Sequence, residues 1–127
     1  REPDELVTAI LVPARSGRAR STFVKLGARR YLVISIAMAA VTLDAGEDGR
    51  IDFAAAAVGA CSPVARRIST LESRLIGRPR NADLAELVRP ADLGELSPIS
   101  DVRGTAEYRR EAAFTLIRRA LRELADE

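Results

Sequence analysis

The chain of 127 residues, with 47% apolar and 30% charged side chains, has the size and composition of one globular domain. Its net charge of +2 is too small to indicate nucleic-acid binding, and no apolar stretch reaches the roughly 20 residues that span a bilayer. Histidine is absent and Cys61 is the only cysteine. These absences exclude a Ser-His-Asp or Cys-His catalytic set, a histidine metal site and an intrachain disulfide.

Two further features concern the origin of the chain. A single cysteine is typical of a reducing compartment, so we expect a cytoplasmic protein. The sequence begins at Arg1 rather than at methionine. We therefore expect residues 1–127 to form a single domain, either with a trimmed start or as the C-terminal part of a longer protein.

The first half of the chain predicts β-strands. Pro13 ends the first of these runs, and Gly46, Asp48 and Gly49 supply the turn that makes the last two a hairpin. The small residues 54–57 would also suit a helix. The predicted strands are residues 5–12, 21–26, 31–43 and 50–60.

The second half predicts helices. Ser62 and Pro63 resemble a helix start, and Gly77 a helix end, around the apolar series Val64, Ile68, Leu71 and Leu75. A second, short helix would begin at Asn81 and end before Pro90. The last helix, from near Thr105, carries an apolar stripe at helical spacing: Ala113, Leu116, Ile117, Ala120, Leu121 and Leu124.

Strands followed by helices predict the α+β class: a mostly antiparallel sheet of three to four strands, with about three helices packed on one face. A doubly wound parallel sheet is excluded, because no helix separates the early strands. Cys61, at the end of an apolar strand, is expected to be a buried small hydrophobe.

Two charged segments leave alternatives open. Residues 15–30 carry most of the clustered positive charge: Arg15, Arg18, Arg20, Lys25, Arg29 and Arg30. They form either a surface for a phosphate-bearing ligand or acidic partner, or a solvated loop and strand edge. Arg103, Tyr108 and Arg109, near the start of the last helix, either contact a partner or form a capping and ion-pair cluster with Asp101.

The joint pattern of several segments resembles a known family. The segments are Phe23-Val24-Lys25-Leu26-Gly27-Ala28-Arg29-Arg30, Asp48-Gly49-Arg50-Ile51, Val58-Gly59-Ala60-Cys61-Ser62-Pro63-Val64-Ala65, Leu71-Glu72 with Gly77, and Asp101 to Arg110. Their order and spacing resemble the C-terminal domain of the FAD-binding (medium) subunit of the molybdenum hydroxylases. That family includes xanthine dehydrogenase and the carbon monoxide dehydrogenase flavoprotein.

The resemblance implies a place in an electron-transfer oxidoreductase. The FAD would be held mainly by a preceding domain, and this domain would close one side of the flavin site. By the same resemblance, Lys25 matches a family lysine close to the flavin, and Val7 an apolar position at the edge of its ring system. The implied partners are that FAD domain, a molybdopterin subunit and an iron–sulfur subunit, with no nucleic acid and no membrane.

Lys25 also stands out in composition, because it is the only lysine beside 19 arginines. An ammonium near the flavin would stabilise negative charge on its reduced form and raise its potential. Otherwise Lys25 is an exposed strand residue. The isolated chain is expected to be catalytically inert. The alternative function is a free-standing protein-interaction module of the same fold with no flavin role.

Overall fold

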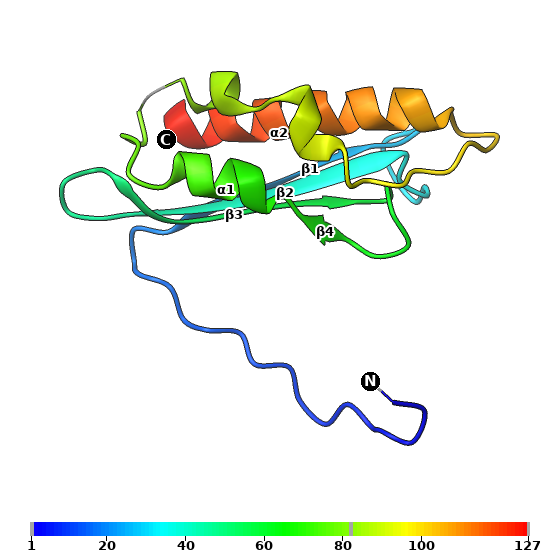
Figure 1. Cartoon of the computed structure of the whole chain (residues 1–127), viewed down its shortest axis with the longest axis horizontal. Helices are drawn as coiled ribbons and strands as arrows, with labels where there is room; N and C mark the ends of the chain where they lie inside the picture. Colours follow the sequence, from blue (N-terminus) through cyan, green and yellow to red (C-terminus); the bar gives the residue numbers. More distant parts are fainter. Residues whose placement is uncertain (1, 82, 127) are drawn as a thin grey trace.

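The computed structural model describes residues 2–81 and 83–126, which form an antiparallel four-stranded sheet with helices on one face (Figure 1). The strands lie in the order β1-β2-β3-β4, so spatial order follows chain order. The α+β prediction is confirmed, although two of the helical segments are 3-10 turns. The elements are β1 (Arg20–Leu26), β2 (Ala37–Ala45), β3 (Ile51–Gly59), β4 (Arg66–Arg67), α1 (Ser69–Leu75), η1 (Leu84–Leu87), η2 (Pro90–Leu93) and α2 (Ala106–Asp126).

The predicted hairpin is β2 and β3, which pair along nearly their whole length, with Ala40 opposite Ala57. The turn is closed by the Gly46 amide, which donates to the Arg50 carbonyl at 2.8 Å. Gly49 there has φ +75°, a conformation that costs a glycine little. The run of alanines in β3 is therefore strand rather than helix.

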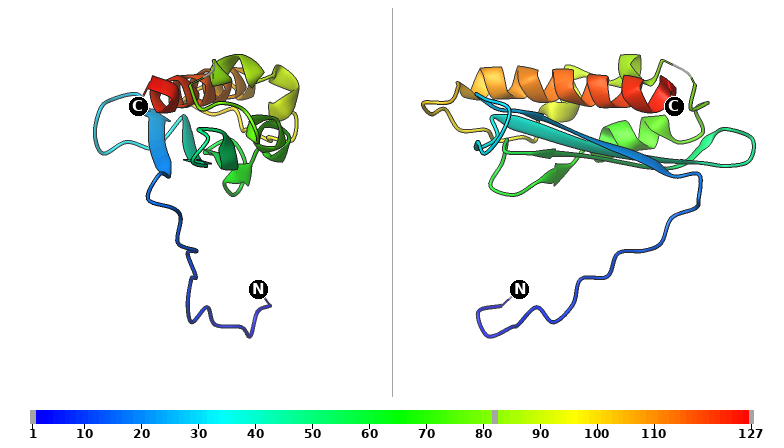
Figure 2. Two further views of the ribbon diagram at one scale, coloured as in Figure 1. Left: turned by 90° about the vertical axis from the view of Figure 1, so that its left-hand side faces the viewer. Right: turned by 180° about the vertical axis from the view of Figure 1, so that it is seen from behind.

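The core lies between the sheet and the helices. Val41 and Leu43 of β2 and Val58 of β3 point to the helical side and are at most 1% exposed. They pack in one cluster with residues of α1 and α2, including Leu71 and Ile117. Figure 2 shows α2 running along the sheet on the same side as the shorter helical turns.

Helix α2 confirms the most regular pattern of the sequence. Every residue of the predicted stripe is buried, and Leu121 and Leu124 are fully so. Its first turn is capped by hydroxyls, because the Ala106 amide donates to Ser100 Oγ at 2.9 Å and the Tyr108 amide to Thr105 Oγ1 at 3.1 Å. No helix in the described part of the chain is long and apolar enough to cross a bilayer.

The prediction of a helix beginning at Ser62-Pro63 was wrong. Residues 62–65 are irregular, Arg66–Arg67 pairs as strand β4 with β3, and α1 begins only at Ser69. The Ser62 hydroxyl instead donates to the Cys61 carbonyl at 2.6 Å, so no cap is formed. The helix predicted from Asn81 is also corrected, since 3-10 turns η1 and η2 occupy that region, on either side of an extended Val88–Arg89 link.

Two strand predictions also need correction. Residues 31–36 form an exposed loop, so the second predicted strand begins at Ala37 instead of Tyr31. Residues 5–12 are not a strand of this sheet. They run away from the sheet as an extended, exposed segment (Figure 1).

Candidate functional site

The face of the sheet opposite the helices is the candidate site, and we call it the open face. Because side chains alternate along a strand, the residues between the core positions of β1, β2 and β3 point to this side. Register pairs Phe23 with Ala40 and Ala40 with Ala57, giving a shallow row with one aromatic ring. Phe23 is 59% exposed. The open face comprises Ser21, Phe23, Lys25, Met38, Ala40, Thr42, Phe53, Ala55, Ala57 and Gly59.

One end of the open face is formed by Lys25, Met38 and Gly59, which are opposite one another in register. The Met38 side chain lies across Gly59, where an added Cβ would meet the methionine methyl carbon at 2.4 Å. The absence of a Cβ at Gly59 thus leaves room for the Met38 side chain, which would have to shift if position 59 carried one. The Lys25 side chain stands exposed beside it.

Lys25 also contacts the loop of residues 27–36, which joins β1 to β2. Its ammonium donates to the Val33 carbonyl at 2.9 Å, and the Arg29 guanidinium donates to the Leu32 carbonyl at 2.7 Å. Leu32 has φ +48°, which is unusual for a branched side chain, and is 92% exposed. Two cations thus hold a loop that presents an apolar tip next to the open face.

The structure does not bring Val7 to Lys25. Val7 lies in the extended segment ahead of β1, 61% exposed, whereas Lys25 is near the end of β1. Of the two positions that the resemblance implies, Lys25 therefore lies on the sheet and Val7 on a segment that extends away from it.

The basic residues of segment 15–30 divide between the two ends of β1 rather than forming one patch. The Arg15 guanidinium lies 3.6 Å from the centre of the Phe53 ring, and Arg18 Nε donates to the Ala45 carbonyl at 3.0 Å. Arg29 binds its own loop, as described above. Most of these cations make contacts with nearby carbonyls or rings.

A buried arginine organises the same end of the domain as Lys25. Arg109 is 3% exposed, and its guanidinium donates to Asp101 Oδ1 and to the Ile36 carbonyl, both at 2.7 Å. The Arg103 amide and the Arg109 guanidinium, as hydrogen-bond donors, lower the pKa of Asp101 to about 2. The cluster is an ion-pair network, as one of the two sequence interpretations predicted. Its burial was not predicted, because nothing in the residue spacing distinguishes Arg109 from Arg110.

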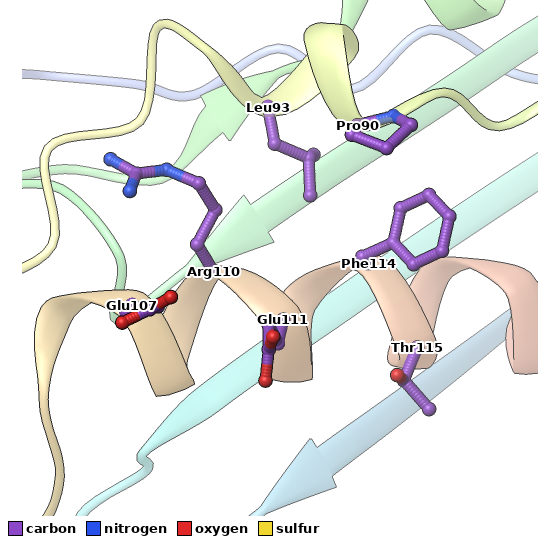
Figure 3. Close-up of a pocket in the computed structure, with 7 residues that line it drawn as sticks. All are labelled: Pro90, Leu93, Glu107, Arg110, Glu111, Phe114 and Thr115. Carbon is purple, nitrogen blue, oxygen red and sulfur yellow. The ribbon is translucent and has the colours of Figure 1, made fainter.

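Two of the hollows among the described residues lie away from the open face. One, of about 290 Å³, adjoins Arg109 and Ile34; the other, of about 580 Å³, lies between η2 and α2 (Figure 3). In the second hollow Arg110 and Phe114 reach from α2 toward Leu93 and Pro90, and the Arg110 guanidinium donates to the Leu96 carbonyl at 3.1 Å. It contains neither predicted site residue. Within the described ranges, no group of three acidic or cysteine side chains gathers as a metal would require.

The residues present fit only part of a flavin. A flat ring can rest against an apolar surface beside one ammonium; at the Lys25 end of the open face that surface is the Met38 side chain, which covers Gly59, with Ala40 and Ala57 further along the strands. A pyrophosphate needs free backbone amides, normally at a helix N-terminus. The first amides of α2 are already bound by Ser100 and Thr105, and Glu107 adds negative charge there. Among the described residues, the Lys25 end of the open face therefore suits the ring of a flavin, whereas the start of α2 does not suit its pyrophosphate.

Comparison with known proteins identifies the family. Residues 22–124 match the CO dehydrogenase flavoprotein C-terminal domain. The chain belongs to this family. A chain of reconstituted CO dehydrogenase from Oligotropha carboxidovorans has the same fold, with a TM-score of 0.78 and 23% identity over 91% of this chain and 40% of that one.

Curated relatives extend the match beyond the family domain. The Nicotine 6-hydroxylase medium subunit of Paenarthrobacter nicotinovorans is 35% identical over 94% of this chain and 41% of its own length. The Caffeine dehydrogenase subunit beta of a Pseudomonas species is 34% identical over 98% of this chain and 42% of its own. The chain thus spans about two fifths of these relatives, and the match to the second takes in residues 5–12.

Proposed function

We propose that these 127 residues are the C-terminal domain of a FAD-containing medium subunit in a molybdenum hydroxylase-type oxidoreductase. In this role the open face packs against the flavin domain and closes one side of the flavin site. The electrons would arrive from a molybdopterin subunit through an iron–sulfur subunit, and the assembly would be cytoplasmic. The domain itself carries no catalytic group, so it contributes shape, packing and charge.

The open face is the observation that carries this proposal. The helical face of the sheet is filled by a complete core, whereas the other face exposes Phe23 and a row of alanines. Small side chains let a second layer approach the backbone closely, and an apolar surface of this kind is typical of a binding interface. The family membership makes a flavin domain the natural partner.

Lys25 is the proposed flavin neighbour. One of its three N–H donors is used by Val33, so two remain for a ligand on the open side. When bound, the flavin accepts and passes on electrons; the ammonium would favour the additional negative charge. Val7 is proposed to reach the edge of the ring only if its segment is placed by the flavin domain.

The intact mass of the native protein and a FAD titration test whether a separate domain holds most of the FAD. We expect a native product with about 160 to 200 further residues, because a FAD domain needs that much chain. The purified 127-residue chain should be colourless and bind FAD no better than about 1 mM, equivalent to about −4.1 kcal/mol. Micromolar quenching of flavin fluorescence by this chain would contradict the proposal, and a native start near Arg1 would favour the interaction module instead.

The role of Lys25 is tested in the complete subunit. Lys25→Met keeps an apolar stem and removes the charge, so the flavin potential should fall by about 30 mV, equivalent to about 1.4 kcal/mol for two electrons. Lys25→Arg should keep most of the potential, because it restores the charge. Arg20→Met, at the opposite end of β1, is the matched control with the same loss of charge. An unchanged potential in Lys25→Met with FAD bound would leave Lys25 as a loop-holding residue alone.

A further inference from the structure

Residues 5–12 are mostly apolar but are exposed in this chain. Leu6, Ile10 and Val12 would lie with Thr8 on one face of an extended strand, and Val7, Ala9 and Leu11 on the other, where Glu5 begins the run. The five large apolar side chains are between 61% and 91% exposed. A segment apolar on both faces is typical of a strand covered on both sides, and not of one on the surface.

The backbone of this segment is also unpaired. In the described part of the chain, no amide or carbonyl of residues 6–14 hydrogen-bonds to another backbone group. An extended run of free donors and acceptors is a template for pairing with another strand. Both its side chains and its backbone therefore lack a partner.

The departure of the segment is fixed by contacts on the open side of the sheet. The Ser16 amide donates to Asp44 Oδ2 at 3.1 Å and the Ser16 hydroxyl to Asp44 Oδ1, while Arg15 stacks on Phe53. Asp44 and Phe53 are opposite each other in register. We call these four residues the exit clamp. All views show the segment leaving on the side of the sheet away from the helices (Figures 1 and 2).

The exit clamp argues against pairing within this chain. The sheet ends at β1 on one side and at the two-residue β4 on the other, but the clamp holds the chain at the ends of β2 and β3. Pairing at β1 would also cover only one face of the segment, because the helices lie on one side of the sheet only. The partner must therefore be a sheet with two covered faces, located on the open side.

We propose that residues 5–12 add a strand to a doubly covered β-sheet in the flavin domain, which packs on the open face. This inference rests on the proposed function for the identity of the partner. The match to the Pseudomonas relative includes the segment although the family domain begins at residue 22, so the segment is shared beyond that domain. The exit clamp would then lie between the added strand and the open face, so that addition of the strand and docking of the open face occur together.

Amide hydrogen exchange on the complete subunit tests the proposal. Amides of residues 6–12 should exchange at least about 100-fold more slowly in the complete subunit than in the 127-residue chain. Equal, fast exchange in both would overturn the strand. Protection already present in the chain alone would also overturn it: concentration-dependent protection would indicate exchange between two copies, and concentration-independent protection would indicate pairing within the chain.

Matched substitutions sharpen the test. Ala9→Pro removes an amide within the proposed strand and should abolish the protection or prevent assembly, whereas Ala14→Pro, outside the strand, should leave protection within about threefold. Ile10→Asn and Leu11→Asn point to opposite faces, and each should reduce protection at least about tenfold. If only one of these two substitutions reduced the protection, the inference that both faces of the strand are buried would be wrong. This test can be separated from the test of the flavin role. Protected amides without bound FAD would support the added strand and contradict the proposed function. Bound FAD with unprotected amides would support the proposed function and contradict the added strand.

Discussion

The helix-covered face of the sheet is built from Val41, Leu43 and Val58, whereas the open face of the same strands carries Phe23, Ala40 and Ala57. The covered face is filled by side chains of this chain alone. The open face has only the exit clamp at one end and the loop of residues 27–36 at the other. The difference separates two tasks within one sheet: one face makes the domain stable, and the other is available to a partner.

Ile117→Ala should produce the largest effect, because Ile117 is fully buried on the covered side. We expect a loss of about 2–5 kcal/mol in the free energy of unfolding, measured by urea denaturation of the 127-residue chain. A loss below about 0.5 kcal/mol would mean that α2 does not pack on the sheet in solution.

Thiol labelling compares the two faces directly. Cys61 is fully buried, and burial raises the pKa of its thiol, so little thiolate is accessible. In an Ala40→Cys variant, the new thiol lies on the open face. We expect Cys61 to react at least about 100-fold more slowly than Cys at position 40, equivalent to about 2.7 kcal/mol of local opening. Similar rates, assigned by peptide mass spectrometry, would contradict the closed core around Cys61.

Acid should reduce the stability more through Asp101, beside the buried Arg109, than through Asp44, in the exit clamp. The pKa of Asp101 is lowered in the folded state, so its contribution to stability is present above about pH 4 and is lost as the pH falls toward 2. Asp101→Asn should flatten this decline in urea unfolding midpoints. Asp44 also has a lowered pKa, mainly through the Ser16 hydroxyl, so by the same linkage it adds to the decline. Its shift is the smaller of the two, so Asp44→Asn should flatten the decline less than Asp101→Asn does, and an equal flattening would contradict the distinction.

Phe23→Ala should have the smallest effect on the chain alone, because Phe23 is mostly exposed on the open face. The expected change in the free energy of unfolding is within about 0.5 kcal/mol. The same substitution in the complete subunit should cost more, if a partner covers the open face. Equal effects in both would indicate that this position stays in solvent.

A sequence pattern predicted its element correctly where the residues that the element packs against lie within this chain. Helix α2 was predictable because its apolar stripe packs on a sheet within the chain. The start of α1 was not, because Ser62 and Pro63 satisfy the local rules for a cap while Arg66 and Arg67 pair with β3, a contact invisible in local sequence. For residues 5–12 the composition predicted a strand, but the exit clamp directs the segment away from the edge of the sheet at β1.

The candidate site was only partly predictable. Lys25 was singled out by composition and by the family resemblance, and its place on β1 was confirmed. The open face was not predicted, because the consecutive alanines of β2 and β3 fall on both faces and do not indicate which face the helices leave bare. Arg109 was seen only as one of several charges. Its burial depends on the Ile36 carbonyl, which is 73 residues away in the sequence, and on Asp101, which lies in the irregular loop before α2.

The single lysine gives this surface a built-in chemical reporter. Amine-directed reagents have one side-chain target in the whole sequence, and it lies beside the loop tip and the open face. Reductive methylation would keep its charge while adding a mass increment that peptide analysis assigns without ambiguity. The rate at which that increment appears, in the separate chain and in any assembly that contains it, would measure how closely a neighbour approaches the end of β1. Because the other 19 basic residues are arginines, docking can be followed at this one position without altering the sequence.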